Sequence, residues 1–105
     1  MEQNVNQDLN TMDNITLDDI REIIDHPFTP AKKNTPNDTF EKGFVFTFSD
    51  GNIVGFDIYK RTHTHGEGHS FFLLKNGKDM QFASTFEVAK SYMYDYTNDY
   101  LQQQN

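Results

Sequence analysis

The stretch FVFTFSDGNIVGFDIY, residues 44–59, decides the fold of this chain. It sets the dipeptide Asp50-Gly51 between two runs of aromatic and β-branched residues, which is a strong short-range signal of a β-hairpin. With Ser49 opposite Asn52, alternation would divide the side chains between two faces. One face would carry Phe44, Phe46, Phe48, Ile53 and Tyr59, and the other Val45, Val54, Phe56 and Ile58. Because both faces are apolar, the hairpin requires cover on each side.

A second hairpin is predicted in HSFFLLKNGKDMQFA, residues 69–83, where Asn76-Gly77 provides the turn. This turn would pair Leu73 with Met80 and Phe71 with Phe82. The two hairpins follow each other along the chain, so a four-stranded antiparallel meander is the simplest topology.

Helical patterns flank these strands. In NITLDDIREIIDHP, residues 14–27, Thr16 can cap a short helix, and Pro27 marks its end because the residue before a proline avoids helical angles. The apolar stripe of that helix would be Leu17, Ile20, Ile23 and Ile24. Near the C-terminus, Ser84 and Glu87 form a capping box. The stripe of the second helix would be Phe86, Ala89, Met93, Tyr96 and Tyr100. We therefore predict an α+β fold with a short N-terminal helix and a C-terminal helix packed across the sheet.

A chain of 105 residues has the length of one domain. We expect a flexible arm over residues 1–13, which are rich in Asn, Gln and Asp, and a single α+β domain over residues 14–105. All three prolines fall within residues 27–42, which predicts a long connecting loop.

The chain has no cysteine, which excludes a disulfide framework, a thiolate metal site and a cysteine nucleophile. No run approaches the roughly 20 apolar residues that span a bilayer, and the polar opening does not resemble a signal peptide. We expect a cytoplasmic protein without a membrane partner.

The net charge of −7 is unevenly distributed. Residues 1–26 carry seven acids and one arginine (−6), residues 27–78 five acids and seven bases (+2), and residues 79–105 four acids and one lysine (−3). The acids of the two predicted helices could form a negative surface that docks onto a basic partner, with tyrosine as an anchor. The candidate partner-binding residues are Asp18, Asp19, Glu22, Asp25, Tyr94, Asp95 and Asp99. The plainer interpretation is a pair of solvated helix faces.

Histidines gather in RTHTHGEGHSFF, residues 61–72. If His65 lies opposite His69, alternation brings His63 to the same face, and three imidazoles with Glu67 could bind Zn²⁺ or another divalent metal. Against this, a tip with two glycines does not hold ligands rigidly, and a shift of one residue would turn some of the histidines to the other face. The alternative is that these histidines are incidental to the hairpin.

Basic residues beside aromatic ones suggest a third possibility, a sheet that binds single-stranded nucleic acid. The candidate contacts are Lys60, Arg61, Lys75 and Lys78, near Tyr59, Phe71 and Phe72. Alternatively, these rings belong to the core and the lysines protect strand edges. We see no serine triad and no glycine-rich phosphate loop, and no cofactor is expected.

The sequence therefore favours a non-enzymatic protein-binding module, such as an inhibitor or regulator of a basic protein that handles nucleic acid. Metal binding and nucleic-acid binding remain the alternatives. The apolar area is also compatible with a homo-oligomer.

Overall fold

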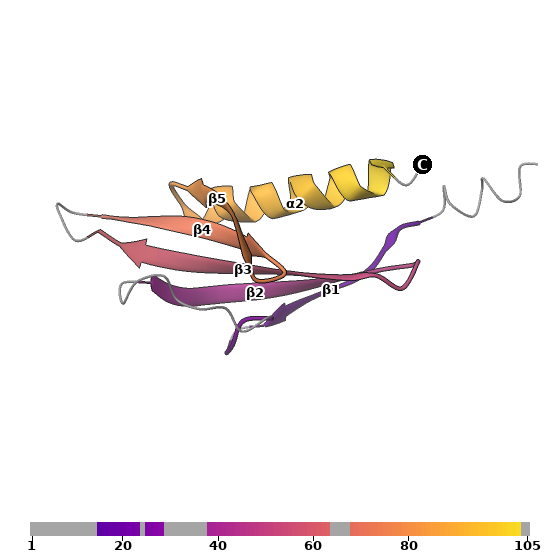
Figure 1. Cartoon of the computed structure of the whole chain (residues 1–105), viewed down its shortest axis with the longest axis horizontal. Helices are drawn as coiled ribbons and strands as arrows, with labels where there is room; N and C mark the ends of the chain where they lie inside the picture. The colour runs from indigo at the N-terminus through magenta and orange to yellow at the C-terminus, as the bar shows by residue number, and fades with distance from the viewer. Residues whose placement is uncertain (1–14, 24, 29–37, 64–67, 104–105) are drawn as a thin grey trace, which may run out of the picture.

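The computed structural model describes residues 15–23, 25–28, 38–63 and 68–103. Within them, five strands form one antiparallel sheet in the order β1-β2-β3-β4-β5, and a helix packs over β3, β4 and β5 (Figure 1). The elements are β1 (Leu17–Ile23), β2 (Asp38–Phe48), β3 (Ile53–Thr62), β4 (His69–Lys75), β5 (Lys78–Ala83) and α2 (Phe86–Gln103). The predicted α+β class, antiparallel sheet and C-terminal helix are confirmed, but the sheet has five strands rather than four. The expected arm, residues 1–13, lies outside the described residues.

The predicted N-terminal helix is wrong, because Leu17–Ile23 is a strand that pairs with β2. A helix of about three turns is marginal by itself in water, whereas strand pairing satisfies the backbone groups along that edge of β2. The misleading spacing has a structural cause. A register shift between Leu17 and Asp19 inserts one extra residue, so that Leu17 lies opposite Phe48 and Ile20 opposite Phe46. A β-bulge thus brings residues three apart to one face, as a helix would.

The first hairpin forms where it was predicted, but its pairing is shifted by one residue. The loop is Ser49-Asp50-Gly51, closed by the Phe48 N–H, which donates to the Asn52 carbonyl at 2.9 Å. Within this loop only Gly51 has a left-handed conformation (φ 94°), whereas the favoured two-residue turn of an Asp-Gly dipeptide needs two such residues. The Asp50 carboxylate accepts a hydrogen bond from the Asn52 N–H at 2.9 Å.

This register changes the two predicted faces. Thr47 now lies opposite Ile53, and Phe46 lies opposite Val54, whereas the sequence suggested Phe48 opposite Ile53. Phe56 and Ile58 consequently join the phenylalanines of β2 in one core, and Ile53 is 52% exposed.

The second hairpin has the expected two-residue turn, with Asn76 and Gly77 both at positive φ (52° and 86°). Lys75 pairs with Lys78, as this turn requires. A further register shift follows in β5, so the observed pairs are Leu73 with Gln81 and Phe72 with Phe82 rather than those predicted.

The main core lies between the sheet and α2, on what we call the helix face of the sheet. Its buried members are Phe44, Phe46, Phe48, Phe56, Ile58, Phe71, Leu73, Ala83, Ala89 and Met93. Of the predicted helix stripe, Ala89 and Met93 are fully buried and the three aromatic members pack around them. The cap is Thr85 rather than Ser84, since Thr85 Oγ1 accepts the Val88 N–H at 3.1 Å.

The opposite side of the sheet, which we call the far face, has a smaller cluster around Tyr59 and Phe72. The Phe28 ring packs directly on Gly55, where no larger residue would fit, and the Phe28 N–H donates to the buried carboxylate of Asp57 at 2.8 Å. Glycine within a strand often marks such a close approach. Burial, reinforced by the charges of Asp57 and Asp38, raises the pKa of Tyr59.

Candidate docking edge

β1 is one of the two outer strands of the sheet, and five of its seven side chains are exposed. Across residues 15–23, 25–28, 38–63 and 68–103, no other strand pairs with its outer edge. An open strand edge offers backbone donors and acceptors to another chain. This edge is therefore the first candidate for a binding surface.

The hydrogen-bond pattern shows which residues of β1 present their backbone outward. The Phe48 N–H donates toward β3, and the Ser49 N–H donates to the Thr16 carbonyl on the β1 side at 3.0 Å. Along an antiparallel strand these directions alternate, so the β2 residues opposite Ile20 and Glu22 bond to β3. The backbone N–H and C=O groups of Ile20 and Glu22 consequently point away from the sheet.

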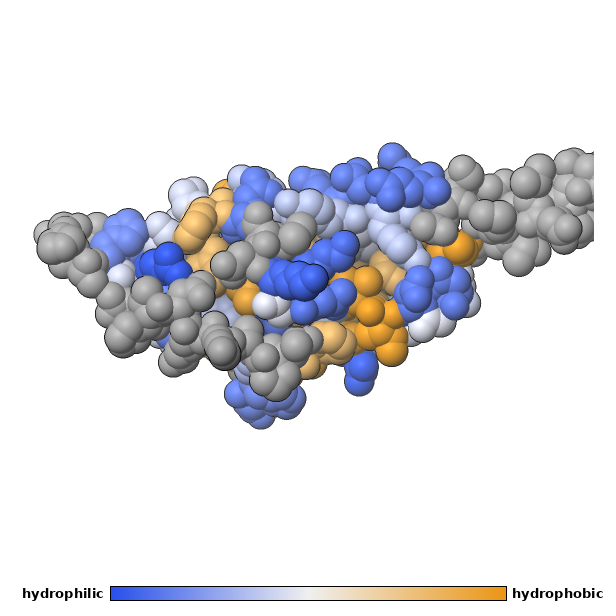
Figure 2. Space-filling view, viewed as in Figure 1, coloured by the Kyte–Doolittle hydropathy of each residue, from blue (hydrophilic) through white to orange (hydrophobic). Residues whose placement is uncertain are grey.

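An apolar spot adjoins this edge on the helix face. Ile20 on β1 lies across from Phe46 on β2, and the Tyr94 ring of α2 meets Phe46 edge to face at 5.9 Å between centroids. Ile20 and Tyr94 are each 38% exposed, while Phe46 between them is fully buried. Figure 2 shows hydrophilic side chains over the outer surface of α2 and hydrophobic side chains gathered below it, over the strands.

The charge of this region is negative. Residues 15–28 carry four acids and one arginine, which gives −3. Two of the acids lie in exposed ion pairs, Arg21 with Asp19 at 3.4 Å and Lys42 with Glu22 at 3.3 Å. Exposed pairs of this kind contribute only about 0–1 kcal/mol, so these acids can change partners at little cost.

The predicted acidic residues fall into two groups. Asp18, Asp19 and Glu22 lie on β1, with Asp25 shortly after it, and all four are exposed. Asp95 and Asp99 are exposed on α2. Asp95 is two residues from each of the buried Met93 and Thr97, which puts it on the outer side of the helix. Of the α2 residues in the predicted set, Tyr94 contacts Phe46 on β2, the strand next to β1.

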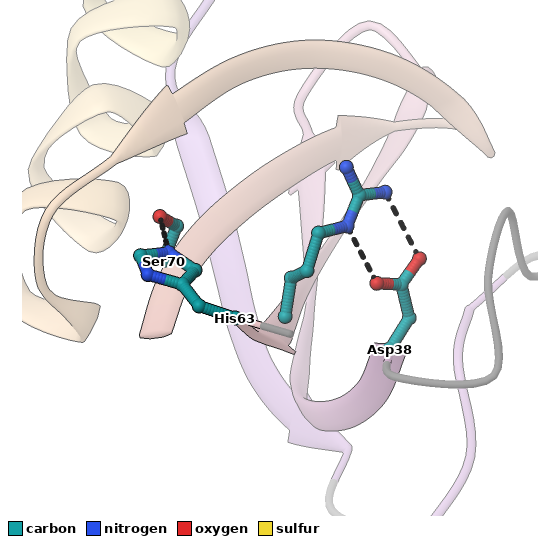
Figure 3. A network of polar contacts seen from close by, with 4 residues as sticks. Asp38, His63 and Ser70 are labelled. Carbon is teal, nitrogen blue, oxygen red and sulfur yellow. Dashed lines mark hydrogen bonds and ion pairs between the residues drawn. The ribbon is translucent and has the colours of Figure 1, made fainter. Parts of the chain in front are cut away.

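The histidine hairpin has a different register from the predicted one. The residue opposite His69 is Thr62, and the His63 N–H donates to the Gly68 carbonyl at 3.1 Å. His63 turns toward Ser70, whose Oγ lies 2.8 Å from its Nε2 (Figure 3).

His69 instead meets the Phe71 ring, which belongs to the core under α2. By alternation, His63 and His69 therefore lie on opposite faces of the sheet. His65 and Glu67 lie outside the described residues. Among those the structure describes, no three His, Asp or Glu side chains are grouped to hold a metal ion.

The predicted basic contacts also divide between the faces. Lys60 pairs with Phe71 and Lys75 with Phe56, both residues of the helix-face core, and Lys78 pairs with Lys75.

Arg61 belongs to the far face, where it makes a bidentate pair with Asp38, at 2.7 Å from Nε and 3.1 Å from a terminal nitrogen (Figure 3). Its guanidinium also lies over the Phe72 and Phe82 rings, at 4.9 and 5.4 Å from their centroids. These contacts engage the arginine in the fold, because Asp38 is fully buried.

Sequence reasoning missed two features of this arrangement. The first is the open edge of β1, because the segment was interpreted as a helix. A signal was present, since isoleucine at positions 20 and 23 has a high strand propensity. The second is the Asp38–Arg61 pair, whose partners are 23 residues apart in the chain and leave no local pattern.

Comparison with known protein families, with curated proteins and with solved structures finds no match to this chain. Within the described residues, no helix has the length and apolar character needed to span a membrane. The function must therefore be inferred from the geometry.

Proposed function

We propose that this chain is a non-enzymatic protein-binding module that docks onto a basic partner through β1 and its surroundings. One observation supports this most directly: an outermost strand combines an open backbone edge, exposed acids and an exposed apolar spot. Each of these features is common alone. Their coincidence on β1 provides hydrogen bonds, charge and an anchor in one place.

The chemistry of the partner follows from the charge. Acids at an interface favour a partner with lysine and arginine, and they speed its association at low salt. Proteins that handle nucleic acid carry such basic surfaces, because they neutralise phosphates. We propose that the module inhibits or regulates a protein of this class by occupying its phosphate-binding groove.

The two alternative functions have less support. A metal site would need His63 and His69 to converge, and they occupy opposite faces. A nucleic-acid-binding sheet would need its cations on one accessible face, but Arg61 is engaged with Asp38 on the far face and the lysines lie on the other side. The overall negative charge also repels phosphate.

Binding of a basic peptide tests the proposal. The probe is a short synthetic peptide in which lysine alternates with valine, and a peptide with glutamate in place of lysine is its control. The variant Asp18→Asn, Asp19→Asn, Glu22→Gln removes three charges from β1. The matched variant Glu87→Gln, Asp95→Asn, Asp99→Asn removes three charges from the exposed outer side of α2.

We expect the lysine peptide to bind, and the β1 variant to bind it about tenfold more weakly than the α2 variant does. Binding should weaken with added salt. Equal losses in the two variants, or no binding of the lysine peptide, would contradict the proposal. Affinity capture offers a second check, because a captured partner that is not basic and is retained in high salt would reject this electrostatic docking.

A further inference from the structure

We infer that the partner binds by strand addition, with an extended basic segment pairing along the outer edge of β1 as a sixth strand. This inference rests on the proposed function and specifies its mode. The alternative mode is docking of side chains alone, in which charges and the apolar spot make contact but the backbone of β1 is not used. The two modes differ in whether the outward groups of Ile20 and Glu22 form hydrogen bonds.

The geometry favours strand addition. The backbone N–H and C=O groups of Ile20 and Glu22 point outward from a strand that is already paired with β2. An incoming strand therefore meets donors and acceptors two residues apart, which is the spacing that an antiparallel ladder requires. All neighbouring strands of the sheet pair antiparallel, so an antiparallel sixth strand continues the same hydrogen-bond pattern.

The side chains on either side of this edge specify the segment. On the helix face, Ile20 and Tyr94 form the apolar spot, and Glu22 follows two residues along. On the far face, Asp19 is exposed and Arg21 follows it two residues along the strand. A segment that alternates apolar and basic residues matches this surface, with its apolar residues on the helix face beside Ile20 and its basic residues on the far face beside Asp19.

A second copy of this chain is a poorer occupant. Two β1 strands related by a two-fold axis would bring together two edges that each carry three acids and one arginine, a net charge of −2 per copy. Like charges placed directly opposite are destabilising. The charge of the edge thus argues for a partner of the opposite sign rather than for self-pairing.

Proline at position 22 distinguishes the two modes. Proline removes the outward N–H but is compatible with an edge strand when that N–H faces solvent. Glu22→Pro and Glu22→Ala both lose the carboxylate and the contact with Lys42, and only the proline variant also loses the donor. Each full-length variant is titrated with the lysine-valine peptide, and circular dichroism checks that it is folded.

Strand addition predicts that Glu22→Pro binds the peptide about tenfold more weakly than Glu22→Ala, because a peptide carbonyl is left without its donor. Equal affinities of the two variants, with binding retained, would overturn strand addition and leave the proposed function standing. No binding by the wild-type chain would overturn both. A doubled mass in solution with no peptide binding would identify a second copy as the occupant and also overturn the inference.

N-methylated peptides keep the inference falsifiable if Glu22→Pro does not fold. Against the wild-type chain, methyl groups on the backbone nitrogens of one alternating set should abolish binding, while methyl groups on the other set should leave it. A strand bonds along one edge through every second residue. Equal effects of the two methylated peptides would overturn strand addition.

Discussion

Gly55→Ala should destabilise the protein through a single collision with Phe28. A Cβ at position 55 would lie 2.6 Å from Phe28 Cε2 and closer still to Cγ and Cδ2. Ordinary carbon contacts are about 3.5–4 Å, so the ring must shift by more than 1 Å or leave the sheet. Because Phe28 is anchored through its N–H to the buried Asp57 carboxylate, a shift of the ring strains that hydrogen bond as well.

The magnitude follows from these contacts. Overpacking of a filled site costs about 1–3 kcal/mol. Alanine is about 0.5–1 kcal/mol more favourable than glycine within a strand, which offsets part of this cost. We therefore expect Gly55→Ala to lower the free energy of unfolding by about 0.5–2 kcal/mol, the balance of these two terms.

A double-mutant cycle isolates the collision. In a Phe28→Ala background the obstacle is absent, and Gly55→Ala should be neutral or stabilise by a few tenths of a kcal/mol. The free energies come from urea denaturation followed by circular dichroism. If Gly55→Ala has the same effect in both backgrounds, Phe28 does not pack on Gly55 and the described path of residues 25–28 is wrong.

Three further predictions concern the rest of the fold. The pKa of Asp50 is lowered by the backbone N–H of Asn52 and then by the hydroxyl of Tyr100, which donates to it at 2.8 Å. The stability that the Asp50 carboxylate contributes is therefore present above its unfolded pKa and is lost as the pH falls through its lower folded pKa. Tyr100→Phe should reduce this loss of stability at acid pH, measured by denaturation at a series of pH values. An unchanged dependence on pH would contradict the contact between Tyr100 and Asp50. Arg61→Leu should lower the free energy of unfolding by about 2 kcal/mol. This cost is smaller than for a fully buried ion pair because the arginine side chain is 28% exposed. An unchanged urea midpoint would show that the pair of Arg61 with the buried Asp38 carboxylate contributes nothing to stability. Met93→Ala should cost about 2–5 kcal/mol by leaving a cavity beneath α2, where Met93 is fully buried, and a cost below 1 kcal/mol would argue against this packing of the helix.

The two hairpins were predictable because their signals are local. Asn76-Gly77 adopts the two positive φ angles that this dipeptide favours, and the turn forms at that site. Asp50-Gly51 also forms a turn, but with Ser49 included in the loop the pairing shifts by one residue. Composition alone does not distinguish a two-residue from a three-residue loop. The shift of one residue moved each side chain of β3 to the face opposite the predicted one.

β1 was not predictable in the same way. Its bulge after Leu17 imitates helical spacing, and its strand state depends on β2, which begins 15 residues after β1 ends. The candidate acids on β1 could be identified from the sequence, since their charge and position are visible there. Their relation to the open edge, and the separation of Asp95 and Asp99 from it, require the three-dimensional arrangement.

Amide hydrogen exchange with and without the lysine-valine peptide tests the account most directly. In the free protein, the N–H groups of Arg21 and Ile23 point toward β2 and should exchange slowly, while those of Ile20 and Glu22 should exchange fast. On addition of the peptide, Ile20 and Glu22 should become protected. Uniform exchange across residues 17–23 in the free protein, or protection by the peptide at another part of the chain with β1 unchanged, would contradict it.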